Sequence, residues 1–182
     1  MTRYLSAIDD GFAKEVGATM TPVWPKVIQD RGSLVRARGN DGVAAYVKAI
    51  PGAIGYVQYT YAALPGQQMA SIENKTGNFL QPTADSFRAA VEAVVAADSA
   101  KRPEVIADPD TQAAYPIVTL SWILMRKEYK DLNKLAALKD LVRYCITDGQ
   151  AQSEVLGYIP APGAVQAIML ERFYKAFEPR TD

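Results

Sequence analysis

The sequence predicts an α/β fold, because segments with strand character alternate with segments that have the periodicity of helices. Residues 53–62 are rich in aromatic and β-branched side chains, and residues 115–127 form the most apolar run of the chain. Residues 84–98 and 132–147 instead place apolar residues three and four positions apart, which indicates amphipathic helices. The 182 residues suffice for one domain or two small lobes.

The first quarter of the chain predicts two helices separated by a surface segment. Residues 2–16 form the first helix, with Thr2 as its candidate N-cap and Gly17 as its stop. Residues 26–38 carry four cations, one acid and little periodicity, which indicates an irregular surface segment. The second helix starts at Asn40 or Asp41, and its apolar face consists of Val43, Tyr46, Val47 and Ile50.

The remaining elements follow from alternation, caps and breakers. Strands are predicted at residues 53–62, 69–73 and 115–127, the last as the central strand. Thr83 caps a helix over residues 84–98, and the proline-containing residues 99–114 form a loop. Further helices are expected over residues 132–147, 150–156 and 164–177.

Composition excludes several classes of function. The formal net charge is zero, so neither a nucleic acid nor an anionic membrane surface is an expected partner. The chain has no histidine, which removes the usual general base and the commonest zinc ligand. The single cysteine, Cys145, lies in an apolar stretch and is expected to be a buried thiol. We therefore predict a protein that is not an enzyme and has no cofactor, metal or catalytic residue.

The chain has no stretch that approaches the length of a membrane span. About 20 consecutive apolar residues are needed to cross a bilayer. The N-terminal residues Met1, Thr2, Arg3 and Tyr4 contain no apolar run that resembles a signal peptide. A secreted protein with this sequence would therefore be a processed product or a fragment with a new methionine.

Three stretches carry motifs in a fixed order, of which the first is specific and the other two are supportive. The first reads GNDGVAAYV from residue 39 and continues as PGAIGYVQYTYA from residue 51. The second reads NKTGNF from residue 74, followed by PT at 82 and SF at 86. The third consists of YPI at 115, WIL at 122, TDGQ at 147 and LGYIP at 156. Their order and spacing resemble PstS-type periplasmic phosphate-binding proteins, and the resemblance extends from Tyr4 to the C-terminus.

The resemblance implies part of a two-lobed periplasmic-binding-protein fold of type II that lacks its N-terminal half. Residues 1–64 would be the remainder of the second lobe, and residues 65–182 the segment that returns to the first lobe. The function it implies is phosphate uptake through an ABC transporter permease, in the periplasm or another extracytoplasmic space.

The sequence departs from the family in two respects. The family's phosphate contacts are Thr, Ser and Asp residues early in its chain, and an Arg followed by a Ser-Gly-Thr motif. That motif lies shortly before the segment that matches Thr2, so no phosphate ligand is carried over to this chain. The family's glycine-rich turn after Trp-Pro is also changed, since a longer cationic segment follows Trp24-Pro25 and only Arg38-Gly39-Asn40 of the turn remains.

One candidate anion site can be formed by this chain alone. The start of a helix offers free backbone amides, and two arginines precede it. The candidate ligands are Arg36, Arg38, Gly39, Asn40, Asp41 and Gly42. The alternative is a capped helix with exposed arginines, and the carboxylate of Asp41 favours it, because this group would compete with an anion for the amides.

Other patterns have a simpler structural interpretation beside a functional one. Tyr56, Tyr59 and Tyr61 could line a cleft, or they could belong to a strand with one buried face. Asp108-Pro109-Asp110 lacks the spacing of a calcium loop and predicts a turn. A modest basic cluster is interleaved with acids and predicts a solvated face; its members are Arg126, Lys127, Lys130, Lys134 and Lys139.

Two hypotheses on function remain open. A chain that lacks half of its fold should expose apolar faces, here those of residues 115–125 and of the helix over residues 84–98. We therefore expect a complementary chain or self-association. In the first hypothesis the chain is a phosphate-binding component that binds phosphate only when the missing N-terminal half is supplied. In the second it is a structural, scaffolding or assembly protein that kept the fold and lost phosphate binding.

Overall fold

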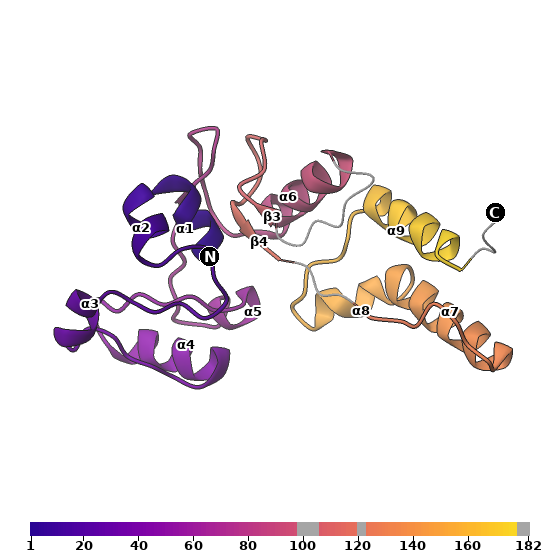
Figure 1. Cartoon of the computed structure of the whole chain (residues 1–182), viewed down its shortest axis with the longest axis horizontal. Coiled ribbons are helices and arrows are strands. Elements are labelled where there is room, and N and C mark those ends of the chain that lie inside the picture. Colours follow the sequence, from indigo (N-terminus) through magenta and orange to yellow (C-terminus); the bar gives the residue numbers. More distant parts are fainter. Residues whose placement is uncertain (98–105, 120–122, 178–182) are drawn as a thin grey trace.

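The structure is a computed structural model that describes residues 1–97, 106–119 and 123–177 (Figure 1). Within these ranges, the chain forms mostly helices and a few two-residue strands. The helices are α1 (Thr2–Ile8), α2 (Asp10–Glu15), α3 (Lys26–Asp30), α4 (Gly39–Ala49), α5 (Tyr59–Ala62), α6 (Ala84–Ala97), α7 (Leu132–Ile146), α8 (Gln150–Val155) and α9 (Gly163–Lys175). The strands are β1 (Ile72–Glu73), β2 (Phe79–Leu80), β3 (Ile106–Ala107) and β4 (Ile117–Val118).

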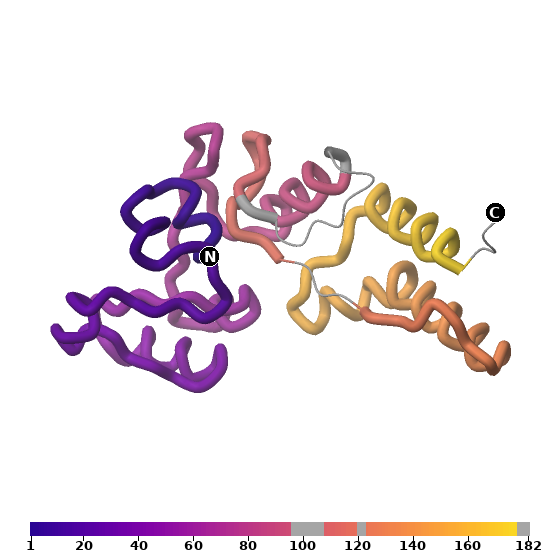
Figure 2. Tube along the Cα trace, in the orientation of Figure 1, coloured from indigo at the N-terminus to yellow at the C-terminus, as the bar shows by residue number. Residues whose placement is uncertain are grey.

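The elements are distributed along the longest axis of the molecule in nearly their sequence order. Figure 2 shows the indigo and violet N-terminal part, with α1 to α5, on one side, and the orange and yellow part, with α7 to α9, on the other. Helix α6 and the strands β3 and β4 lie between these two parts (Figure 1). The assignment of residues 1–64 and 65–182 to two different lobes stays a prediction.

The predicted helix over residues 2–16 is interrupted at Asp9. This residue is extended, with φ −140° and ψ 114°, and its carboxylate accepts the N–H of Phe12 as the N-cap of α2. An aspartate here favours a new helix start because its oxygen satisfies an amide that would otherwise have no partner. Thr2 lies inside α1, and its hydroxyl donates to the carbonyl of Thr19 at 2.6 Å, so it is not the N-cap. Gly17, with φ +75°, ends α2 as predicted.

The predicted strand over residues 53–62 was wrong. Residues 59–62 form the helical turn α5, and residues 53–58 have no regular secondary structure. A strand depends on hydrogen bonds to a neighbouring strand, and none pairs with these residues in the part of the chain that the structure describes. The sequence pattern indicates that these residues have strand propensity, but it does not show whether a neighbouring strand is present.

The described strands form two short antiparallel pairs. In the first, Ile72 lies opposite Leu80, and in the second, Ile106 lies opposite Val118. Strand β1 lies within the strand predicted over residues 69–73, whereas its partner β2 was not predicted. Strand β3 falls inside the predicted loop over residues 99–114, and residues 98–105 lie outside the described part. The chain is mixed helix and sheet, as predicted.

The long central strand predicted over residues 115–127 is absent from the described part of that segment. Only Ile117 and Val118 are paired there, and residues 123–127 have no regular structure, while residues 120–122 lie outside the described part. In place of a central sheet, the largest buried cluster surrounds α6. Its members are Ala90, Val91, Val95, Ala114 and Val165. The predicted inward face of α6 is therefore confirmed at Val91 and Val95.

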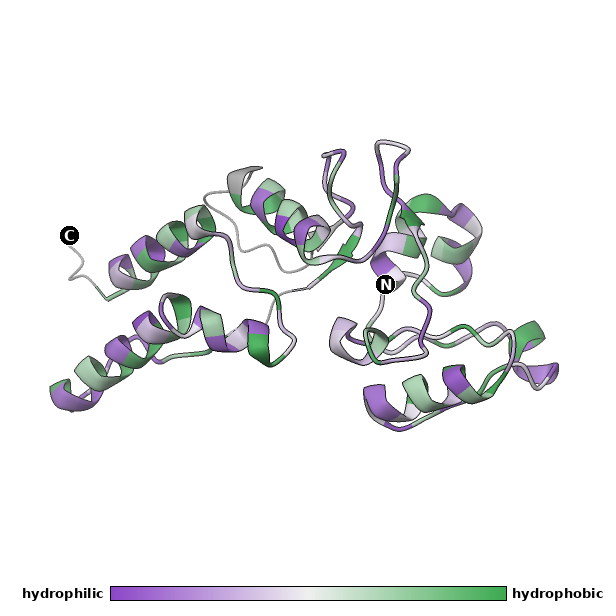
Figure 3. Cartoon of the chain, turned by 180° about the vertical axis from the view of Figure 1, so that it is seen from behind, coloured by the Kyte–Doolittle hydropathy of each residue, from purple (hydrophilic) through white to green (hydrophobic). Residues whose placement is uncertain are grey.

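The C-terminal helices agree closely with the sequence prediction, since α7, α8 and α9 begin and end within two residues of their expected bounds. The side chain of Asp131 accepts the N–H groups of Asn133 and Lys134 and so caps α7. Thr83 caps α6, since its hydroxyl oxygen accepts the N–H of Ser86 at 3.2 Å. Figure 3 shows hydrophobic and hydrophilic residues alternating around these helices. Cys145, predicted to be buried, is only half-buried on α7.

A single buried asparagine joins the two strand pairs. Asn74 follows β1 and is 4% exposed. Its side-chain N–H₂ group donates to the carbonyls of Thr111, Gln112 and Ala114, at 3.1, 3.1 and 3.3 Å. Its side-chain oxygen accepts the backbone N–H groups of Thr76 and Asn78, at 3.1 and 3.0 Å. One side chain therefore closes its own turn and holds the segment before β4 against it.

Truncation of this side chain should destabilise the chain. In Asn74→Ala, buried carbonyls and amides lose their partner, so we expect the free energy of unfolding to fall by about 2–4 kcal/mol. The matched control is Asn78→Ala, in the same turn, whose exposed amide donates to the Thr76 hydroxyl at 2.8 Å; its cost should stay below about 1 kcal/mol. Urea unfolding followed by circular dichroism measures both, and equal costs would contradict the role given to Asn74.

Candidate functional site

The candidate anion site lies at the start of α4. Arg38 is the extended N-cap residue, with φ −85° and ψ 121°, and its side chain makes no capping hydrogen bond. Gly39 follows with φ +70°, in the left-handed region that glycine tolerates best. A Cβ atom on Gly39 would lie 2.6 Å from Oδ1 of Asp41, so the carboxylate of Asp41 lies beside the first residue of the helix.

The other candidate ligands are engaged in packing or point to solvent. Oδ1 of Asn40 accepts the backbone N–H of Gln58 at 3.0 Å and thereby joins the start of α4 to the start of α5. A Cβ atom on Gly42 would lie 3.3 Å from the Cβ of Ala37, which shows a close approach of the chain to this turn of the helix. Arg36 and Arg38 are exposed, and no carboxylate of the described residues forms an ion pair with either.

The arrangement favours a structural interpretation of this helix start. Positive charge from two arginines and the helix dipole would attract an anion. The carboxylate of Asp41 carries the opposite charge at the same place, and the site is open to water, where such attractions are screened. Binding of an anion by residues 36–42 stays a prediction.

The tyrosines of the first motif do not share one pocket. The ring of Tyr59 contacts Phe87 edge to face, with centroids 5.1 Å apart, and Phe87 contacts Tyr115 in the same manner at 5.4 Å. Tyr59 thus joins α5 to α6, whereas Tyr56 lies on the exposed side of its segment. Burial and the nearby Tyr4 raise the pKa of Tyr115.

Tyr4 is a residue whose role was not predicted from the sequence. It is 5% exposed, and its hydroxyl donates to the carbonyl of Glu73 at 2.6 Å, which ties α1 to β1 next to Asn74. Desolvation raises the pKa of its phenol, and the negative charges of Asp108 and Glu73 add to the effect. A tyrosine on a short helix has no local signal of such a contact, because the partner is 69 residues away.

Residues 108 and 110, predicted to lie in a turn, are bends in the connection between β3 and β4. Asp108 has φ +48°, and its Oδ1 accepts the backbone N–H of Lys75 at 2.7 Å. Asp110 forms an exposed ion pair of 3.5 Å with the side chain of Lys75. Both carboxylates therefore stabilise the contact with the turn after β1. Among the described residues, no group of three side chains is arranged to hold a metal ion.

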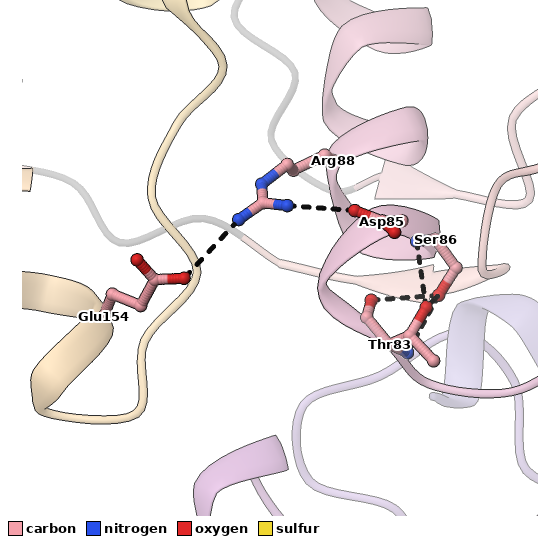
Figure 4. Close-up of polar contacts among 5 residues, drawn as sticks. All are labelled: Thr83, Asp85, Ser86, Arg88 and Glu154. Atoms are coloured by element: carbon pink, nitrogen blue, oxygen red, sulfur yellow. Dashed lines mark hydrogen bonds and ion pairs between the residues drawn. The ribbon is translucent and has the colours of Figure 1, made fainter. Parts of the chain in front are cut away.

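An ion-pair network links α6 with α8. Figure 4 shows Arg88 between two carboxylates, with Asp85 at 2.9 Å on its own helix and Glu154 at 3.9 Å on α8. The same view shows the Thr83 and Ser86 hydroxyls that fix the start of α6.

In the predicted basic cluster, Lys139 lies 5.1 Å from the ring centroid of Phe177. These contacts are structural, and none of them is arranged to bind a ligand.

A shallow hollow of about 300 Å³ lies between α2 and α3. Apolar side chains form most of its lining, and Asp9 and Glu15 add two carboxylates. The lining residues are Asp9, Gly11, Phe12, Glu15, Val16, Trp24, Pro25 and Ile28. This composition does not suit phosphate, because an anion would meet two negative charges and few donors.

Within the described ranges, every helix is too short or too polar to span a bilayer.

Substitution of Gly39 tests the backbone geometry at the start of α4. Gly39→Ala places a side chain at φ +70° beside Asp41, so we expect a loss of about 1–2 kcal/mol in the free energy of unfolding. The control is Gly163→Ala at the start of α9, where a Cβ atom would meet nothing within 4 Å. That change should be neutral or slightly stabilising. Thermal unfolding measures both variants, and a neutral Gly39→Ala would contradict this geometry.

Comparison with curated proteins found relatives along most of the chain. The phosphate-binding protein PstS of Methanocaldococcus jannaschii is 35% identical over 183 residues, a match that covers 93% of this chain and 46% of the relative. The PstS of Xylella fastidiosa strain 9a5c is 34% identical over 161 residues, covering 88% and 42%. The PstS of Pasteurella multocida is 31% identical over 164 residues, covering 90% and 46%. A scan against models of protein families gave no match.

These matches confirm the resemblance predicted from the motifs. The shares of the relatives that are covered, between 42% and 46%, are consistent with the predicted C-terminal half. The chain is thus similar to PstS phosphate-binding proteins over most of its own length, and it spans less than half of theirs.

Proposed function

We propose that this chain supplies the C-terminal half of a PstS-type phosphate-binding protein that delivers phosphate to the permease of an ABC transporter. The observation that carries the proposal is the 35% identity over 93% of the chain to a protein named for phosphate binding. Residues 1–64 would belong to one lobe and residues 65–182 to the other. The periplasm or an equivalent extracytoplasmic space is the location that such a role requires.

The phosphate contacts of the proposed function come from polypeptide that precedes Thr2 in the family's order. Carboxylates disfavour phosphate at the start of α4, where Asp41 lies, and in the hollow between α2 and α3, where Asp9 and Glu15 lie. We infer that an N-terminal segment, as part of a longer chain or as a separate chain, completes the site.

Exposed apolar side chains support this need for further polypeptide. The inward face of α6 is covered by α9 and the segment around Ala114, contrary to the expectation that it would be open. Residues 123 and 124, at the end of the apolar run, are exposed as expected, and Leu124 is 90% exposed. Large apolar side chains that face water in this way indicate a surface that another segment or chain covers.

A scaffolding or assembly protein that lost phosphate binding is the second candidate. It is favoured by the Lys26–Asp30 helix and the exposed segment that follows it, which replace the glycine-rich turn of the family. The carboxylate of Asp41 beside the remaining Gly39 adds to this argument. In this case phosphate binding would be absent even when the N-terminal half is supplied.

Isothermal titration calorimetry with inorganic phosphate tests the proposal. The N-terminal half of the Methanocaldococcus jannaschii relative is fused to Met1, and the fusion is compared with the chain alone. We expect no heat of binding for the chain alone. For the fusion we expect one site with a Kd of about 1 μM or tighter, equivalent to about −8 kcal/mol.

The controls separate loss of function from loss of folding. Circular dichroism establishes that the fusion is folded, and the intact relative serves as the positive control for phosphate binding. Titration with chloride at the same ionic strength excludes a nonspecific effect of salt. A folded fusion that gives no heat with phosphate would favour the scaffolding protein over the phosphate-binding component.

A further inference from the structure

The hollow between α2 and α3 is built from one short stretch of the chain. All of its lining residues lie between positions 9 and 28, in the two helices or in the connection between them. Within this stretch, the rings of Phe12 and Trp24 meet edge to face, with centroids 6.3 Å apart. Its volume of about 300 Å³ is at the lower end of the range for small-molecule pockets, which suits one long side chain better than a large ligand.

The carboxylates of this hollow have no cation to balance them. Asp9 and Glu15 line the hollow and are exposed. One oxygen of Asp9 accepts the N–H of Phe12, but no lysine or arginine of the described residues forms an ion pair with either carboxylate. Lys14 and Lys26 are close in sequence, yet neither lines the hollow. A mostly apolar surface with two unpaired carboxylates is complementary to a cation that has an apolar stem.

An arginine side chain has both of the features that this surface requires. Its guanidinium group is planar, stacks on aromatic rings and binds carboxylates through two N–H groups. Its aliphatic stem can pack on apolar side chains of the lining, such as Val16 and Ile28. The ammonium group of lysine is a compact and more strongly hydrated charge, so it matches an aromatic lining less well.

We propose that the hollow between α2 and α3 binds an arginine side chain that a partner polypeptide projects from its surface. Asp9, Glu15 and Ile28 are exposed, so the hollow is open to water and the backbone of the partner stays outside it. Free arginine is a poorer occupant, because its α-carboxylate would lie near two negative charges. The inference does not rest on the binding of phosphate and adds a protein-binding site to the proposed function.

An NMR titration of the ¹⁵N-labelled chain with the blocked tripeptide acetyl-Gly-Arg-Gly-amide tests the proposal. The signals to follow are the indole N–H of Trp24 and the backbone amides of residues 11–16. We expect saturable shifts with a Kd on the order of 1–10 mM, since a single cation–π contact and exposed ion pairs each contribute little. The same peptide with citrulline, a neutral analogue of nearly the same shape, should bind at least about tenfold more weakly.

Charge-neutralising variants make the test specific to the hollow. Asp9→Asn combined with Glu15→Gln removes both carboxylates, and α2 should be retained because asparagine caps a helix as well as aspartate does. The Kd for the arginine peptide should rise at least about tenfold. The matched control is Asp10→Asn combined with Asp30→Asn, which removes the same charge from exposed residues of α2 and α3 that do not line the hollow. Its Kd should change less than about twofold.

Several results would overturn the proposal. Among them are equal affinities for the arginine and citrulline peptides, and the absence of saturable shifts in the folded chain. Equal losses of affinity in the two double variants would count against it too, because the attraction would then be long-range. Shifts of the Trp24 signal that grow with the concentration of the chain alone, and that Arg36→Gln with Arg38→Gln abolishes, would assign the hollow to a second copy instead of a different partner. None of these results bears on calorimetry with phosphate, so the two proposals fail separately.

Discussion

The buried side-chain amide of Asn74 is the interaction that joins the two strand pairs in the middle of the chain. It holds the turn after β1 and the segment before β4 in one network of hydrogen bonds. Tyr4 attaches α1 to the same place through the carbonyl of Glu73. The backbone of Lys75, the next residue, is bound by Asp108. Since these segments are far apart in sequence, one buried polar cluster replaces the extensive sheet that an α/β protein usually has for this purpose.

Helices could be predicted from the sequence because their determinants are local. Thr83 and Asp131 cap α6 and α7, these helices and α9 have apolar residues with a period of 3.6, and α6 to α9 appear close to their expected bounds. Strands could not be predicted equally well, because a strand requires a partner. Residues 53–58 have no paired neighbour among the described residues, and in the described part of the apolar run from residue 115 only Ile117 and Val118 are paired.

The functional family could be predicted from ordered motifs, although individual sites could not. The sequence predicts that the carboxylate of Asp41 competes with an anion for the amides at the helix start. In the structure this carboxylate lies beside Gly39, where such competition is expected. Tyr4 and Asn74 were not identified as important, since their partners are 69 and about 40 residues away and no local pattern encodes them. The first two motifs contain residues with structural contacts, since Asn40 joins α4 to α5 and Asn74 joins the two strand pairs.

The proposed function requires that phosphate is held by polypeptide outside this chain and that the start of α4 does not bind it. The most direct measurement follows the backbone amide signals of the ¹⁵N-labelled chain in an NMR titration with inorganic phosphate. This account predicts that the signals of Gly39, Asn40, Asp41 and Gly42 do not shift in a saturable manner. A saturable shift confined to these four amides would contradict it, because the chain would then bind phosphate through its own helix start.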